Sequence, residues 1–417
     1  MLVSKLKSKK YINSSFGVFS TNLAISFLGI SSGTLVARML GAEGRGELAQ
    51  VILLFSLITS IFSFSINDRL AVEKENRSML FYGLISVAQF FVLTPFVIFY
   101  GYFSGFDLLS IYLISMSLVT FYTLNVFGLM INRGELFLNS IFKLILPLSY
   151  NFLLVFLFLN YDINDIEVRH ILIANFLSNL LLLIPCGLWL INEAENSMKK
   201  CYSITFWIRK NFKYIVTTHL FSVFLLVFSQ IERIFIINYF PVNFVGQFVV
   251  SVSIVVFTYT IIINTSKTVI LNKVTSFDTT EDLQYCYFKY LKALVLLCSL
   301  AFVLICIISP YYILILFGEE YRESITISYY YALAYAPVAV KLSLFHSFRL
   351  VLNRKNLILL EIFTVVPAML ISIYGVMINS YELIVFSFSL SSVIYVFLIS
   401  FLKGKYLIYG CENEKKC

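Results

Sequence analysis

The chain has 417 residues, of which 59% are hydrophobic and 13% are charged. Soluble domains carry about 25% charged residues, so this composition excludes a soluble globular protein and predicts an integral membrane protein. Apolar runs of about 20 residues, each long enough to cross ~30 Å of hydrocarbon as a helix, predict an all-α polytopic chain. The formal net charge of +8 indicates Lys and Arg held on the cytoplasmic face rather than a nucleic-acid partner.

Twelve membrane-spanning helices are expected along the chain, separated by short polar loops. Their predicted ranges are 16–40, 47–67, 79–102, 107–130, 138–160, 170–192, 214–240, 247–270, 290–316, 325–348, 357–377 and 382–402. Most of the 31 Lys and Arg residues fall in the N-terminus, the C-terminus and alternate loops. That bias predicts that both termini are cytoplasmic.

The longest internal polar break divides these helices into two sets of six. We therefore expect an N-terminal six-helix bundle over 1–195, a linker over 196–213, a C-terminal bundle over 214–404 and a cytoplasmic tail over 405–417. The linker places Phe206, Trp207 and Phe212 among Lys and Arg. It is either a helix lying in the membrane interface or a flexible connection.

A charged, glycine-rich segment, "ARMLGAEGRGELAQV" at 37–51, joins the first two predicted helices. Its glycines permit positive φ angles, and its charges hold both helix ends at the water boundary, so a tight turn at the outer face is expected. Shifted by 200 residues, it lies over "INYFPVNFVGQFVVS" (237–251), and Gly46 coincides with Gly246. This match predicts parallel repeats, an arrangement in which transporters carry a site between the halves.

The same segment resembles the pattern "AR-x-L-G-x-x-x-x-G-x-x-A" of Wzx-type O-antigen and polysaccharide flippases. Three further stretches resemble that family in order: "SQIERIFIINYFPVNFVGQFVVS", "ILFGEEYRESI" and "LVLNRKN". These flippases belong to the multidrug/oligosaccharidyl-lipid/polysaccharide (MOP) exporter superfamily. Lipid II flippases of the same superfamily place arginines in the first helix, where this chain offers residues such as Asn22 and Ser26.

The resemblance implies a MATE-like MOP fold with two six-helix bundles around a cationic cleft. It implies a multi-pass protein of the bacterial inner membrane that moves a polyprenyl-diphosphate-linked oligosaccharide, such as an O-antigen unit, from the cytoplasmic to the periplasmic leaflet. Its partners would be the undecaprenyl-diphosphate-linked cargo, the lipid bilayer, a polysaccharide polymerase and a chain-length regulator. No cofactor is expected, and coupling to H⁺ or Na⁺ stays open.

Ionisable side chains inside membrane helices are costly, so each is a candidate functional group. Four cations, Lys341, Arg233, Lys143 and Lys267, are the predicted binders of the anionic diphosphate and the sugars. Tyrosines at 329, 330, 331 and 335 add rings that could stack on sugars or form an interfacial belt.

Two carboxylates, Glu232 and Glu361, are the candidate sites for a coupling ion. Neighbouring helix positions point about 100° apart, so Glu232 and Arg233 should face different partners. Glu361 is either an ion site or the partner of a cation such as Arg354 or Lys355.

Two alternatives remain. A drug or cation antiporter of the same superfamily would need a deep carboxylate in the first half, and the sequence shows none. An enzyme such as an O-antigen polymerase would need a sizeable outer loop, whereas the longest one predicted is 161–169. Because motifs of hydrolases, P-loop proteins and zinc proteases are missing as well, the chain is not expected to be an enzyme.

Overall fold

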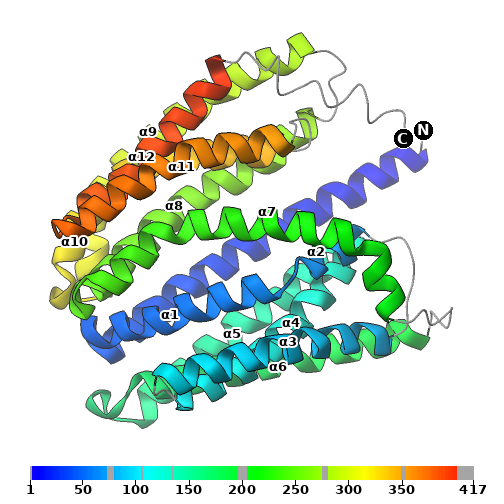
Figure 1. Cartoon of the computed structure of the whole chain (residues 1–417), viewed down its shortest axis with the longest axis horizontal. Coiled ribbons are helices and arrows are strands. Elements are labelled where there is room, and N and C mark those ends of the chain that lie inside the picture. Colours follow the sequence, from blue (N-terminus) through cyan, green and yellow to red (C-terminus); the bar gives the residue numbers. More distant parts are fainter. Residues whose placement is uncertain are drawn as a thin grey trace. The chain divides into compact units, whose positions relative to one another are not determined.

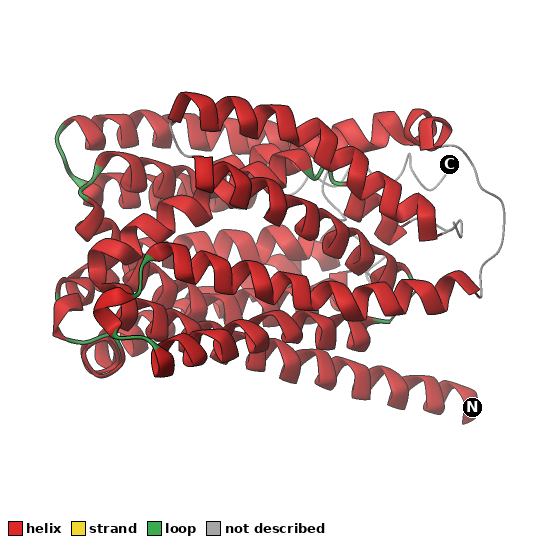
Figure 2. Ribbon diagram, turned by 90° about the horizontal axis from the view of Figure 1, so that it is seen from below, coloured by secondary structure: helices red, strands yellow, loops and turns green. Residues whose placement is uncertain are grey.

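The computed structural model describes residues 2–72, 79–104, 107–133, 135–195, 204–274, 280–348 and 354–401. Within these ranges the chain forms helices joined by loops, with no strand (Figure 2). The predicted all-α fold class is therefore confirmed.

Twelve α-helices and two short 3₁₀ turns make up the described ranges. The helices are α1 Leu2–Phe62, α2 Ile66–Val72, α3 Met79–Ser104, α4 Asp107–Asn132, α5 Leu136–Asn160, α6 Val168–Glu195, α7 Ile204–Tyr239, α8 Val242–Val274, α9 Thr280–Leu316, α10 Glu323–Phe348, α11 Arg354–Met377 and α12 Tyr381–Phe401. The turns are η1 Ile163–Asp165 and η2 Glu319–Tyr321.

The predicted spans from 79 onward each coincide with one helix, from α3 to α12. The first two spans differ, because both fall largely in α1, where Gly41 alone leaves helical dihedral angles (φ 65°, ψ −174°). The ribbon turns back on itself at that point (Figure 1). The expected loop is thus a one-residue break between two helical segments.

Eight of the described helical segments are long and apolar enough to cross a membrane. They include Leu359–Met377 in α11 and Tyr381–Phe401 in α12, with mean hydropathies of 2.0 and 2.3. Bulky apolar side chains on these helices are exposed, as lipid contact requires; Phe363 and Phe397 are examples. The chain is a multi-pass membrane protein.

The chain divides into two compact units. Unit 1 contains Met1–Leu40 and Gln50–Val227, and unit 2 contains Gly41–Ala49 and Phe228–Cys417. The division falls inside α7, and the tip of the glycine-rich turn belongs to unit 2 although the helical segments on both sides of it belong to unit 1.

Unit 1 has an apolar core between α2, α3, α4, α6 and the start of α7. Trp207 is fully buried there and packs edge-on against Phe81, with ring centroids 5.5 Å apart. Phe206 and Phe212, on the other side of the helix, are exposed. Because α7 already begins at Ile204, the flexible-connection alternative is wrong for 204–213; the remainder of the predicted linker, 196–203, lies outside the described residues.

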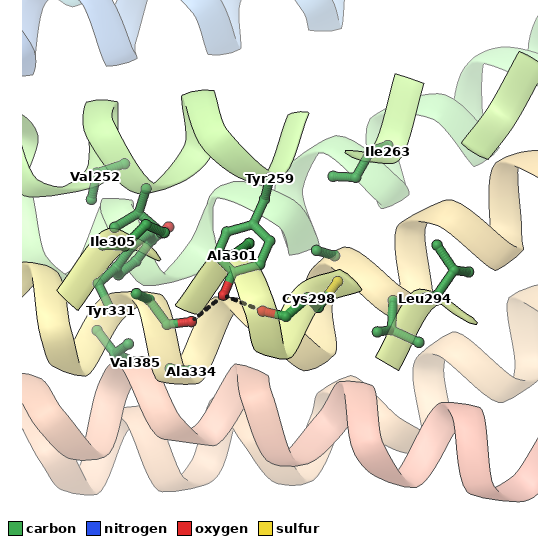
Figure 3. Packing of buried hydrophobic residues seen from close by; sticks show 14 of the residues in the cluster. Val252, Tyr259, Ile263, Leu294, Cys298, Ala301, Ile305, Tyr331, Ala334 and Val385 are labelled. Atoms are coloured by element: carbon green, nitrogen blue, oxygen red, sulfur yellow. Dashed lines mark hydrogen bonds between the residues drawn. The ribbon is translucent and has the colours of Figure 1, made fainter. Parts of the chain in front are cut away.

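Unit 2 is built around α8, α9 and α10 (Figure 3). Tyr259 of α8 is fully buried, and its hydroxyl donates to the carbonyl of Ala332 on α10 at 3.0 Å. The same hydroxyl lies 3.4 Å from the carbonyl of Cys298 on α9. One side chain thereby ties three helices together inside the core of unit 2.

The turn at Gly41 is held by a carboxylate from a distant part of unit 2. The backbone N–H of Ala42 donates to Oε1 of Glu320 at 2.7 Å. This contact caps the first turn of the second segment of α1, where backbone N–H groups lack helical partners and favour a negative charge. Gly41 itself needs its glycine because its φ of 65° is one that L side chains rarely adopt.

The repeat predicted at an offset of 200 residues is visible in the backbone contacts of unit 2. A Cβ added to Gly46 would lie within 3.0 Å of the carbonyl oxygen of Val242, and one added to Gly246 would lie that close to the carbonyl oxygen of Ala42. Each glycine thus packs against the residue that begins the helical segment after the turn of the other repeat. The two turns interlock backbone to backbone, a contact that only a residue without a side chain permits.

This interlock predicts opposite effects of alanine at different glycines. Gly46→Ala or Gly246→Ala should destabilise the folded protein by about 1–3 kcal/mol, because a methyl group would force two backbones apart. Thermal unfolding of the detergent-solubilised full-length protein measures the effect.

The matched control is Gly29→Ala in α1, where an added Cβ would meet no atom within 4 Å. That substitution should leave stability unchanged or raise it by up to about 1 kcal/mol, because alanine loses less entropy on folding. Equal melting temperatures for Gly46→Ala and Gly29→Ala would contradict the interlock.

Candidate functional site

Glu232 and Arg233 of α7 face different partners, as their helix geometry requires. Glu232 is buried (7% exposed), and the hydroxyl of Tyr331 on α10 donates to its Oε1 at 2.6 Å. Arg233 Nη1 instead donates to Oε1 of Gln230, one turn earlier on its own helix, at 3.3 Å. The carboxylate therefore joins two helices through a neutral hydroxyl donor, and the guanidinium of Arg233 also lies within electrostatic range of it.

Aromatic rings enclose this acidic group. Tyr331 stacks on Tyr335 at a centroid distance of 5.5 Å and meets Phe248 edge-on at the same distance. Arg233 lies within electrostatic range of both tyrosines. Of the predicted tyrosine cluster, Tyr331 is thus committed to the interior of unit 2, whereas Tyr330 is exposed.

Lys341 and Glu361 form a second polar cluster, between α10 and α11. Lys341 Nζ lies 2.6 Å from Glu361 Oε2, and both side chains are buried. The ammonium also lies over the ring of Tyr395 on α12, 4.7 Å from its centroid. A buried ion pair with a cation–π contact places two full charges of opposite sign, net neutral, inside the helical bundle.

This pairing differs from the partners that the sequence suggested for Glu361. Arg354 and Lys355 begin α11, and their side chains lie outside the described residues. The observed partner, Lys341, comes from a different helix 20 residues earlier. Cations close to Glu361 along the chain are the partners that the sequence suggests. The packing of the helices determines which charges meet.

The other two predicted cations are in different situations. Lys143 on α5, in unit 1, is exposed, and its Nζ lies 5.3 Å from the ring centroid of Phe127. Lys267 lies in α8, but its side chain is not among those the structure describes. The structure therefore brings together Lys341 with Glu361, and Glu232 with a tyrosine, and leaves the roles of Lys143 and Lys267 as predictions.

Unit 1 contains a polar network that sequence reasoning missed. Asn125 of α4 donates to Gln89 Oε1 and to Ser86 Oγ, each at 2.9 Å. Gln89 in turn donates to the carbonyl of Ser63 at 2.7 Å. In the sequence it shows only as single amides inside apolar runs, which stand out less than charges do.

The interior of unit 1 thereby differs chemically from that of unit 2. Among the described residues, the buried polar side chains of unit 1 are hydroxyls and amides, while those of unit 2 include Glu232, Lys341 and Glu361. Within the same described ranges, no cluster of three or more His, Cys, Asp or Glu side chains could hold a metal ion.

The carboxylate of Glu232 depends on the hydroxyl of Tyr331. Tyr331→Phe would leave it buried with no donor from α10, a loss that costs about 1–3 kcal/mol. We expect a lower melting temperature for that variant in detergent. Tyr330→Phe, at the exposed neighbouring position, should melt like the parent protein, and equal melting of the two variants would contradict the assignment.

No protein-family model matches the chain, and no curated protein sequence is significantly similar to it. Solved structures do match. The lipid II flippase MurJ in an inward closed conformation superposes with a TM-score of 0.71 at 14% identity, covering 94% of this chain and 87% of that one.

Two structures from the MATE family of multidrug resistance transporters, within the MOP superfamily, match as well. The inward-facing structure gives a TM-score of 0.64 at 12% identity, covering 91% of this chain and 93% of that one. The outward-facing structure gives 0.60 at 14% identity and covers 94% of both chains. At these identities the similarity establishes the architecture. The chain has the helical fold shared by the lipid II flippase and the MATE transporters of the MOP superfamily.

Proposed function

We propose that this protein is a flippase that moves a polyprenyl-diphosphate-linked oligosaccharide from the cytoplasmic to the periplasmic leaflet by alternating access. The proposal combines the fold, the sequence resemblance to Wzx-type flippases and the chemistry of the buried charges. The alternative is a drug or cation antiporter of the same superfamily, since MATE transporters share the fold.

The observation that carries the proposal is the buried Lys341–Glu361 pair. Glu361 lies in a segment apolar enough to cross the membrane, and its partner on α10 is 2.6 Å away. Intramembrane charges are costly and mark substrate or ion pathways. A lysine ammonium is a compact point charge of the kind that binds phosphate groups, so Lys341 suits an anionic headgroup.

The described buried polar side chains of unit 1 are uncharged, which favours the flippase over the antiporter. A cation or drug antiporter would be supported by a buried carboxylate there, and the described part of unit 1 buries amides and hydroxyls instead, such as Asn125 and Gln89. Such groups are suited to sugar hydroxyls, which they can bind as donors and acceptors.

For a coupling ion, Glu232 is the stronger of the two candidates. Its carboxylate accepts a hydrogen bond from a neutral hydroxyl, whereas that of Glu361 already has a cation in Lys341. A proton or Na⁺ could bind that carboxylate, with the guanidinium of Arg233 within electrostatic range as the resident positive charge.

The decisive experiment deletes the gene and determines on which leaflet the polyprenyl-diphosphate-linked single repeat unit accumulates. We expect accumulation on the cytoplasmic leaflet, relieved when the gene is restored. Single units on the outer leaflet would indicate a polymerase, and accumulated lipid II would indicate a different cargo. No accumulation of any lipid-linked intermediate would favour the antiporter.

Restoring the gene as a variant tests the role of Lys341. Lys341→Ala should impair export of surface polysaccharide, while Lys341→Arg should retain part of it, because the positive charge remains. The control is Lys289→Ala, at an exposed position of α9, which should export normally. Full surface polysaccharide with Lys341→Ala at normal protein level would rule out this role for the lysine.

A further inference from the structure

Tyr395 is buried beside the Lys341–Glu361 pair but makes no hydrogen bond of its own. The residue is 1% exposed, and its hydroxyl has no partner among the described residues. It lies within electrostatic range of Glu361. A buried hydroxyl without a partner loses the hydrogen bonds it had in water, which makes it an unusual feature of a folded interior. It would gain a partner if Glu361 lost its present one.

The ion pair spans two helices that are joined mainly through a third. α10 and α11 each pack extensively along α12, and far less against each other. The side chain of Lys341 crosses the ring of Tyr395 to reach Glu361. The ion pair therefore connects α10 and α11 directly, next to Tyr395 of α12.

Both helices carry a proline close to the ion pair. Pro337 is one turn before Lys341 in α10, and Pro367 follows Glu361 by less than two turns in α11. A proline inside a helix removes a backbone hydrogen bond and allows a bend at that point. The segments that carry the two charges are thus the parts of α10 and α11 best able to move when the pair separates.

The chemistry of Lys341 allows it to exchange one anionic partner for another. Its ammonium has three donors on a flexible stem, of which one is used by Glu361, so it can be recruited by a stronger anion without losing its charge. A diphosphate carries more negative charge than a single carboxylate. Once Lys341 turned to it, the carboxylate of Glu361 would be left buried, and the O–H of Tyr395, which lies within electrostatic range and has no partner, would be available to satisfy it.

We propose, resting on the proposed function, that Lys341, Glu361 and Tyr395 form an anion-exchange latch. In the closed state, seen here, Glu361 occupies Lys341 and the Tyr395 hydroxyl has no partner. In the open state the diphosphate of the cargo takes Lys341, and Tyr395 donates to Glu361. Glu361 is therefore a resident anion that competes with the cargo, and Tyr395 is a positioning residue that stabilises the cargo-bound state.

Binding of undecaprenyl diphosphate to the purified full-length protein in detergent micelles tests the latch. Glu361→Gln should bind it roughly tenfold more tightly than the parent, because the competing charge is gone. Tyr395→Phe, which keeps the ring over Lys341, should bind it several-fold more weakly, because the open state loses a hydrogen bond to a charged group. Inorganic pyrophosphate as a second probe separates recognition of the diphosphate from that of the lipid.

The melting temperature distinguishes a latch from a purely structural contact. Tyr395→Phe removes an unsatisfied buried hydroxyl, so the cargo-free protein should be as stable as the parent or more stable, although its affinity falls. In the Glu361→Gln background, Tyr395→Phe should have little further effect on affinity, since no buried charge remains to be satisfied. Tyr374→Phe and Glu323→Gln, at exposed positions of α11 and α10, are the matched controls.

Equal affinities of the parent and Glu361→Gln for undecaprenyl diphosphate would overturn the latch, as would a loss of stability without a change of affinity in Tyr395→Phe. Absence of binding by every variant would also overturn it. These binding results are independent of the leaflet on which the cargo accumulates in the deletion strain. The latch can therefore be wrong while the proposed flippase function is correct.

Discussion

A polar group on a membrane-spanning helix has to find its partner inside the protein, because hydrocarbon offers none. This constraint organises both polar clusters of unit 2. Glu232 reaches a tyrosine on α10, and Glu361 reaches a lysine on the same helix. The two contacts lie about 15 Å apart along α10, taking ten residues at 1.5 Å each. α10 is thus the element on which the buried charges of unit 2 converge.

The two carboxylates are satisfied in chemically different ways. Glu232 accepts a hydrogen bond from the neutral hydroxyl of Tyr331, with the guanidinium of Arg233 within electrostatic range. The cluster at Glu361 is neutral and gains nothing from a further cation; it changes only if one of its charges is taken elsewhere.

The interlocked turns explain a motif that looks functional in sequence. Charged residues and glycines between two apolar helices invite a binding role, but Gly41 supplies a positive φ, and Gly46 and Gly246 supply close backbone approach. The carboxylate of Glu320 completes the contact by capping Ala42. The motif is conspicuous because two backbones meet there, which leaves little freedom in side-chain size.

The fold class and the presence of the helices from α3 to α12 followed from the sequence alone, because hydrocarbon thickness sets the length of each apolar run. The offset of 200 residues between Gly46 and Gly246 was also readable in it. The sequence also singled out Lys341 and Glu361, since charges stand out in apolar helices. Tertiary structure decided that these two meet and that Tyr395 lies beside them with an unused hydroxyl. Partners on different helices are fixed by how the helices pack, and hydropathy carries no information about that.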